Sequence, residues 1–140
     1  MTLVIDAAPL VALADRRDPA QSLVERTLRR EVGALVIPAP VSAEVDYLLY
    51  TRLGERARQA FLDDLAAGRF LVECLEPQEY ATVAELERVY ETIAPGLAGL
   101  SIVVLARRFR TRRILTADER HFRTLRPLQG GSFTLLPADA

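Results

Sequence analysis

Short apolar runs alternate along the chain with longer segments in which apolar residues recur at the spacing of an α-helix. The apolar runs predict β-strands at residues 3–5, 34–37, 70–75, 113–116 and 133–136. The segments with helical spacing lie at residues 23–31, 41–53, 55–67, 79–93 and 100–109. Strands that alternate with helices in this way form a mostly parallel sheet with helices on both faces. We therefore expect one α/β domain over residues 1–140, built on a sheet of four to five strands.

Two of these segments lead to expectations about the core. Residues 102–106 read Ile-Val-Val-Leu-Ala, so the helix at 100–109 is apolar on nearly every side and should be buried. The only cysteine, Cys74, lies in the apolar run at 70–75, and we expect it to be a small core residue. A single cysteine also excludes an internal disulfide, and nothing in the sequence indicates an oxidising compartment.

Composition narrows the class of protein. Of the 140 residues, 50% are hydrophobic, and 18 basic side chains nearly balance 19 acidic ones, which is typical of a folded globular protein. No apolar run approaches the roughly 20 residues that cross a bilayer, and the N-terminal segment lacks the basic flank of a signal peptide. We therefore expect a cytoplasmic protein that does not contact a membrane.

Every basic residue is an arginine. The absence of lysine excludes sites that need an amine, namely a P-loop, a Schiff base and the acidic pocket of response-regulator receiver domains. The arginines are unevenly distributed: residues 107–126 hold eight of them with two acids, whereas residues 1–106 hold ten with sixteen acids. Such a basic segment is either a phosphate-binding surface or a solvated helix face with a loop, and both interpretations stay open on charge alone.

Acidic side chains stand where two of the predicted strands end. Asp6 directly follows the first strand, and Asp118 follows the fourth. Glu44 lies within the first turns of the helix after the second strand. Because ligands of an open parallel sheet bind beyond the carboxyl ends of its strands, we expect these three carboxylates to converge. The alternative is structural, with Asp6 as the cap of the helix that follows it and Glu44 as a surface residue.

A cluster of carboxylates has a chemical consequence. Like charges within a few ångströms raise one another's pKa or require a cation, and oxygen ligands suit Mg²⁺ or Mn²⁺ rather than zinc. A hard divalent ion beside arginines is an arrangement that cleaves phosphodiesters, because the ion activates water and neutralises charge on the phosphate. The predicted catalytic and metal-binding residues are Asp6, Glu44 and Asp118. Thr116 and Ser101 are expected to give polar support, and Arg120 to contact a phosphate.

Four blocks of the sequence carry a family resemblance. A hydrophobic strand ends in Ile5-Asp6, and residues 40–48 read Pro-Val-Ser-Ala-Glu-Val-Asp-Tyr-Leu. Residues 96–103 read Gly-Leu-Ala-Gly-Leu-Ser-Ile-Val, and residues 114–122 read Ile-Leu-Thr-Ala-Asp-Glu-Arg-His-Phe, with Leu-Arg-Pro at 125–127. With these blocks, nearly the whole chain resembles PIN-domain proteins of the VapC toxin type.

The resemblance implies a three-layer PIN-like fold and a function. Such proteins are endoribonucleases that depend on Mg²⁺ or Mn²⁺, usually form homodimers and are inhibited by a small VapB-like antitoxin encoded beside them. The implied substrate is RNA, cleaved at a site formed by Asp6, Glu44 and Asp118. The family activates water with its metal ion, so His121 is expected to pack a short helix rather than to act as the base.

Two positions depart from the family pattern. These proteins usually bring a further acid from a Leu-Ala-Asp-Ala-type stretch, whereas this chain has Gly99 there, and Ala7 stands where Thr or Ser usually follows the first aspartate. Losing a ligand weakens metal binding and misplaces the ion. Two functions therefore stay open. The chain is either a toxin ribonuclease weakened or inactivated by Gly99, or a non-catalytic protein of the same fold that binds an antitoxin, RNA or both without cleavage.

Overall fold

Five short strands form one sheet in which every pair of neighbours runs parallel. The computed structural model describes residues 1–140. In their spatial order, the strands are β3 (Leu71–Glu73), β2 (Leu35–Pro38), β1 (Leu3–Ile5), β4 (Arg113–Leu115) and β5 (Thr134–Leu136). The predicted α/β fold with a parallel sheet is confirmed, and each predicted strand overlaps one observed strand.

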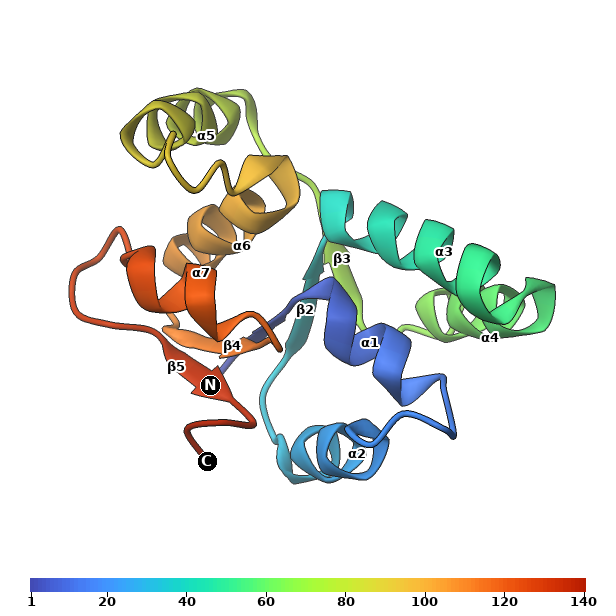
Figure 1. Ribbon diagram of the computed structural model, residues 1–140. Coiled ribbons are helices and arrows are strands. Elements are labelled where there is room, and N and C mark those ends of the chain that lie inside the picture. The colour runs from blue at the N-terminus through green and yellow to red at the C-terminus, as the bar shows by residue number, and fades with distance from the viewer.

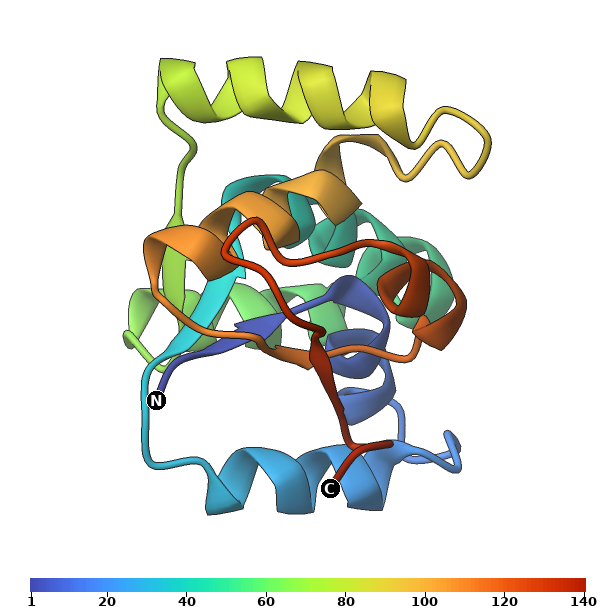
Figure 2. The ribbon, with the colours of Figure 1, turned by 90° about the vertical axis from the view of Figure 1, so that its left-hand side faces the viewer.

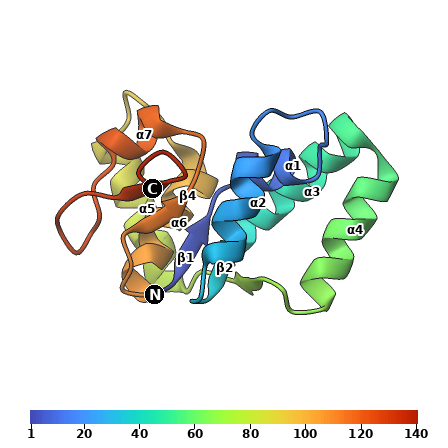
Figure 3. The same ribbon diagram turned by 90° about the horizontal axis from the view of Figure 1, so that it is seen from below.

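Seven helices cover both faces of this sheet (Figure 1). They are α1 (Ala7–Leu13), α2 (Gln21–Arg30), α3 (Ala39–Leu53), α4 (Glu55–Ala66), α5 (Pro77–Val89), α6 (Gly96–Arg108) and α7 (Glu119–Thr124). Seen from below, α5 and α6 lie on one side of β1 and β2, and α1 to α4 lie on the other (Figure 3). None of the helices has the length and apolarity needed to cross a bilayer. The molecule thus has the three-layer arrangement that the resemblance implied.

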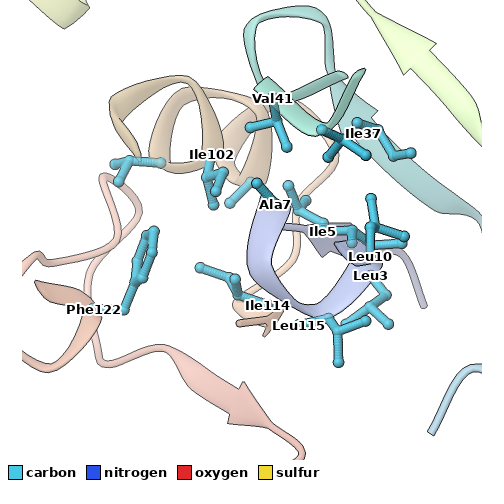
Figure 4. Close-up of a cluster of buried hydrophobic side chains, with 14 of the residues drawn as sticks. Leu3, Ile5, Ala7, Leu10, Ile37, Val41, Ile102, Ile114, Leu115 and Phe122 are labelled. Carbon is cyan, nitrogen blue, oxygen red and sulfur yellow. The ribbon is translucent and has the colours of Figure 1, made fainter. Parts of the chain in front are cut away.

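Strand β1 lies at the centre of both the sheet and the core. Its residues Leu3, Val4 and Ile5 have no solvent-exposed surface, because β2 and β4 pair with β1 on its two sides and helices cover its faces. Figure 4 shows side chains of β1 in one cluster with others from α1, α3, α6 and α7. The point at which the chain leaves this cluster, the carboxyl end of β1, therefore has a fixed position.

The middle of helix α6 is buried on every side. All seven residues from Leu100 to Ala106 are buried, which confirms the helix predicted from the apolar run at 100–109. The helix packs on three strands of the sheet and on α3 and α5. Because protein interiors are close-packed, α6 cannot slide without disturbing these contacts, so its first turn is held in place relative to the strand ends.

The prediction that Cys74 lies in the core is wrong. Strand β3 ends at Glu73, and Cys74 follows it as an exposed residue. Leu71 and Val72 of the same strand are also exposed, because β3 is the edge of the sheet and pairs only with β2. An apolar run of this kind indicates a strand, but it does not distinguish an edge strand from a central one.

Several arginines of the segment at 107–126 bind other parts of the protein. Three of its eight arginines pair with acids, and these pairs are Arg108–Glu79, Arg113–Glu31 and Arg123–Asp139. Arg112 donates instead to the backbone carbonyls of Gln129 and Gly130. Much of the local excess of positive charge is therefore used to join distant segments of the chain, which supports the structural interpretation of this segment over a phosphate-binding surface.

The Arg123–Asp139 pair predicts a pH-dependent contribution to stability. The Asp139 carboxylate accepts hydrogen bonds from the guanidinium (2.7 and 2.8 Å) and from the backbone N–H of Leu135 (2.8 Å), and Arg123 is the main reason that its pKa falls to about 2. A lowered carboxyl pKa stabilises the fold above the unfolded-state pKa, and this contribution is lost as the pH falls through the folded-state pKa. We expect Asp139→Asn to lower the urea midpoint of unfolding at neutral pH, and the difference to shrink below about pH 4.

The matched control for this prediction is Glu85→Gln, which removes one exposed negative charge from α5. Its urea midpoint should follow that of the unsubstituted protein at every pH. Equal midpoints for Asp139→Asn and the unsubstituted protein at neutral pH would show that the Arg123–Asp139 pair contributes nothing to stability.

The Arg123–Asp139 pair also connects the end of the chain to α7, and the last residues lie beside α2 (Figure 2).

Candidate active site

Asp6 is positioned by the register of the two central strands. Ile5 pairs with Leu115, and the backbone N–H of Asp6 donates to the carbonyl of Leu115 (2.9 Å). This register places Asp6 beside Thr116, whose hydroxyl donates to Asp6 Oδ2 (2.7 Å). Asp6 Oδ1 accepts from the backbone N–H of Ala7 (2.8 Å) and so caps α1. Asp6 therefore caps α1 and also lies at the carboxyl end of β1, so the structural interpretation and the site interpretation apply to the same residue.

Asp118 is held by the same hydroxyl group. Thr116 Oγ1 accepts from the backbone N–H of Asp118 (2.9 Å), so one buried side chain joins the ends of β1 and β4. Asp118 in turn caps α7, because its Oδ1 accepts from the backbone N–H of His121 (3.0 Å), and its Oδ2 lies 2.9 Å from His121 Nδ1. These bonds orient both carboxylates but use only part of their acceptor capacity, since an ionised carboxylate has about four acceptor sites.

The three predicted carboxylates line one pocket. Its volume is about 480 Å³, and its acids are Asp6 at the start of α1, Glu44 in the second turn of α3 and Asp118 at the start of α7. Gly99 of α6 and His121 of α7 border the same pocket. Four separate segments of the chain therefore meet beyond the carboxyl ends of β1 and β4. The roles of these residues in metal binding and catalysis stay predictions.

A second hollow, of about 560 Å³, lies between α1, α3 and α4. Its lining is mostly apolar and includes a single carboxylate, Asp64, which pairs with Arg69 (3.3 Å). The chemistry expected of this chain needs several acids in one place, so we locate the candidate site in the acidic pocket and not in this apolar hollow.

Two carboxyl groups of the acidic pocket have raised pKa values. Burial raises the pKa of Asp6 above its usual range, the hydrogen bonds from Thr116 and Ala7 oppose this shift, and the charge of Asp118 adds to it. Burial also raises the pKa of Glu44, with a further contribution from Asp6. Raised carboxyl pKa values mean that the fold disfavours these negative charges. A cation bound among them would remove that cost.

The donor set fits a hard divalent ion. The pocket offers carboxylate oxygens, which Mg²⁺ and Mn²⁺ prefer. No three His, Cys, Asp or Glu side chains lie close enough together in this structure to ligate one ion. However, Mg²⁺ is usually held by one or two carboxylates, and water completes its shell. Asp6 and Asp118, which share Thr116 as a hydrogen-bond partner, form such a pair.

Gly99 leaves an open place in the wall of the acidic pocket. It lies within the first turns of α6, and a Cβ built on it would meet only the Cβ of Pro95, at an ordinary van der Waals distance of 3.6 Å. A side chain at this position is therefore sterically acceptable. In the family pattern, this is the position of the further acid.

The residues predicted to assist the acids have different outcomes. Thr116 contacts both aspartates, as described above. Ser101 does not border the pocket, because it is fully buried and its hydroxyl donates to the carbonyl of Ala98 (2.6 Å) within α6. The polar support expected from Ser101 therefore stays a prediction. Arg120 is exposed on α7 and does not border the pocket, so its contact with a phosphate stays a prediction.

Arg52, which was not expected at the site from the sequence, is the only arginine that borders the acidic pocket. The spacing along the sequence could have indicated this position, because Glu44, Leu48 and Arg52 follow one another at intervals of four residues on α3. Residues at this spacing lie near the same face of a helix. All three border the pocket.

Removing the Thr116 hydroxyl is expected to lower the free energy of unfolding by about 1–3 kcal/mol. Thr116 is 2% exposed. Thr116→Val deprives the backbone N–H of Asp118 of its acceptor and removes the hydrogen bond that favours ionised Asp6. Urea unfolding measures the loss of stability, and a Mn²⁺ titration measures the effect on the pocket.

Thr111→Val is the matched control for this prediction. Thr111 is also 2% exposed, donates to the carbonyl of Thr2 and accepts from the backbone N–H of Arg113, but it precedes β4 and lies away from the pocket. We expect both variants to lose similar stability and only Thr116→Val to lose affinity for Mn²⁺. Equal Mn²⁺ affinity in the two variants would contradict a role for Thr116 in the site.

Comparison with known proteins places the chain among relatives of similar length and fold. The model of the PIN domain family matches residues 3–126. The chain is 39% identical to ribonuclease VapC26 of Mycobacterium tuberculosis over 135 residues, which are 96% of this chain and 100% of the relative. Its fold is similar to the crystal structure of Mycobacterium tuberculosis VapC20, described as a toxin that cleaves the sarcin-ricin loop, with a TM-score of 0.74 over 80% of this chain and 86% of that one. At 16% identity, the likeness to VapC20 concerns the fold alone.

Proposed function

Because the chain belongs to the PIN domain family and to its VapC proteins, we propose that it is a metal-dependent endoribonuclease that acts as a toxin. The observation that carries this proposal is the meeting of Asp6, Glu44 and Asp118 in one pocket beyond the strand ends. These are the acids that the family pattern matches. The name of VapC26 as a ribonuclease supports RNA as the substrate.

Each part of the pocket has a role in this proposal. Asp6 and Asp118 would hold Mg²⁺ or Mn²⁺, which when bound activates water and neutralises the charge that develops on the phosphate. Glu44 adds a third carboxylate to the same pocket. The hydroxyl of Thr116 keeps Asp6 oriented, and His121 fixes the carboxylate of Asp118. Preorganised acids of this kind need no rearrangement when the substrate arrives.

The proposal extends to partners and location. Membership of the VapC proteins supports a VapB-like antitoxin that binds the chain and inhibits it. We further propose a homodimer that acts on RNA in the cytoplasm. None of these features depends on a particular residue of the pocket, so each is tested separately from the chemistry.

Gly99 favours a second function. An acid is missing from the place where the family pattern has one, and the pocket keeps room for it. A protein with this change would retain the fold and the surfaces that bind an antitoxin or RNA, and it would not cleave. The two functions differ in one measurable property, which is RNA cleavage by the unsubstituted protein.

A metal titration joined to a cleavage assay tests the proposed function. We expect Mn²⁺ or Mg²⁺ to raise the melting temperature of the purified protein, since an ion at 100 times its Kd stabilises the fold by about 2.7 kcal/mol. We expect cleavage of single-stranded or loop-containing RNA in the presence of either ion and none in EDTA. Cleavage that persists in EDTA would reject the metal dependence, and the absence of cleavage with either ion would favour the non-catalytic function.

A further inference from the structure

The acidic pocket has a cationic end, which is formed by Arg52. This residue lies in the last turn of α3, eight residues after Glu44. At 1.5 Å per residue, the two side chains leave the helix at points about 12 Å apart along its axis. Leu48, midway between them, also borders the pocket. The wall along α3 therefore runs from an acid through an apolar residue to a guanidinium.

The guanidinium of Arg52 forms no ion pair within the protein, and the two acids nearest to it in sequence, Asp46 and Glu55, bind Arg58 instead. Arg58 Nε and Nη2 lie 2.9 and 3.2 Å from the two oxygens of Asp46, and Arg58 Nη1 lies 3.4 Å from Glu55 Oε2. Arg58 also lies over the ring of Tyr50, 4.5 Å from its centroid. Arg52 is exposed and forms no ion pair. All of its N–H donors are therefore available to an anion.

We propose that Arg52 binds a phosphate group of the RNA other than the one that is cleaved, so that the site recognises a strand of several nucleotides. The inference rests on the proposed nuclease function. A free guanidinium forms bidentate hydrogen bonds with a phosphate. Arg52 borders the pocket without pairing with any of its acids, so it is available to a phosphate beyond them. The apolar wall at Leu48 lies between Glu44 and Arg52, where a ribose or base would cross from one phosphate to the next.

A structural role for Arg52 predicts different results. A cation in the last turn of a helix stabilises that helix through its dipole, and such a role would change the melting temperature and not the affinity for RNA. The test therefore measures binding. Fluorescence anisotropy of a labelled, short single-stranded RNA of random sequence is measured with Mg²⁺ in the Asp6→Asn background, in which we expect RNA to bind and cleavage to be too slow to interfere.

Arg52→Gln is expected to weaken the binding of this RNA by about tenfold or more. It should also reduce the slope of log K against log salt by about 0.7, the value for one phosphate contact on a single strand. Arg52→Lys keeps the charge and loses the planar fork, so it should retain the slope and recover part of the affinity. A dinucleoside monophosphate, which has one phosphate, should bind equally with and without Arg52.

Arg88→Gln is the matched control, because Arg88 is exposed in the last turn of α5 and lies away from the pocket. Its affinity and salt slope should stay unchanged. Unchanged binding in Arg52→Gln, or an equal loss in Arg88→Gln, overturns the role of Arg52 while the unsubstituted protein still cleaves RNA. If the unsubstituted protein neither binds nor cleaves any RNA, the proposed function fails, and the role of Arg52 fails with it.

Discussion

The Asp6→Asn protein is expected to cleave RNA about 1,000-fold more slowly than the unsubstituted protein and yet to unfold at a higher temperature. Cleavage falls because the amide removes the negative charge that a metal ion requires, and a factor of this size corresponds to about 4 kcal/mol of transition-state stabilisation. Stability rises because burial makes the ionised carboxylate at this position unfavourable. The substitution keeps an acceptor oxygen for the cap of α1.

The stability difference should depend on pH in a defined direction. Since the pKa of Asp6 is raised in the folded state, its ionisation destabilises the fold above that pKa and has no effect below the unfolded-state pKa. In EDTA, the advantage of Asp6→Asn should therefore be largest near neutral pH and shrink as the pH falls. Added Mn²⁺ should reverse the order, because the unsubstituted protein binds the ion and is stabilised by mass action.

Asp46→Asn provides the control for both measurements. It removes the same charge from α3, but Asp46 lies outside the acidic pocket and binds Arg58. The hydrogen bond from Arg58 is the main reason that the pKa of Asp46 is lowered, so this carboxylate stabilises the fold when it is ionised. Asp46→Asn should therefore retain cleavage and melt at a lower temperature. Full cleavage by Asp6→Asn would reject the assigned site.

Gly99→Asp is expected to raise both the affinity for Mn²⁺ and the rate of RNA cleavage by about tenfold or more, since even the partners of metal ligands change affinity by 10- to 100-fold. The side chain has room, because only Pro95 lies within 4 Å of its Cβ. The new carboxylate borders a pocket that already contains three acids, so it adds a repulsive charge as well as a ligand. The variant should melt below the unsubstituted protein in EDTA and above it in Mn²⁺.

Gly99→Asn separates the charge of the new side chain from its volume. It is expected to lack the gain in Mn²⁺ affinity and in cleavage. If the unsubstituted protein is inactive and Gly99→Asp cleaves RNA, the chain as it stands is the non-catalytic binding protein. If Gly99→Asp and Gly99→Asn behave alike, position 99 has no part in holding the ion.

The meeting of the acids could be predicted because chain connectivity decides it. Parallel strands end at the same edge of a sheet, so a residue directly after β1 and one shortly after β4 become neighbours, whatever lies between them in sequence. Asp6 and Asp118 are in this position. The burial of α6 could be predicted for a similar reason, since a helix apolar on every side has no face suited to water.

The surroundings of three residues could not be predicted from the sequence. Cys74 follows an edge strand, and the apolar pattern of one run does not show where its strand lies in the sheet. Ser101 bonds within α6 instead of reaching the pocket, which depends on the rotation of that helix about its axis. Arg52 forms no ion pair, whereas Arg58 binds the two acids nearest to Arg52 in sequence, and only the packing of α3 on α4 decides which arginine has a partner.

Asp6 and Asp118 serve folding as well as the pocket, because each caps a helix. Replacing such a cap by alanine costs a protein about 1 kcal/mol. A lineage that no longer needed the chemistry would still be under selection to keep short acceptor side chains at these two places. Gly99 caps no helix, since it lies inside α6 beside Pro95. A substitution at position 99 would therefore remove no helix cap, whereas substitutions at positions 6 and 118 would.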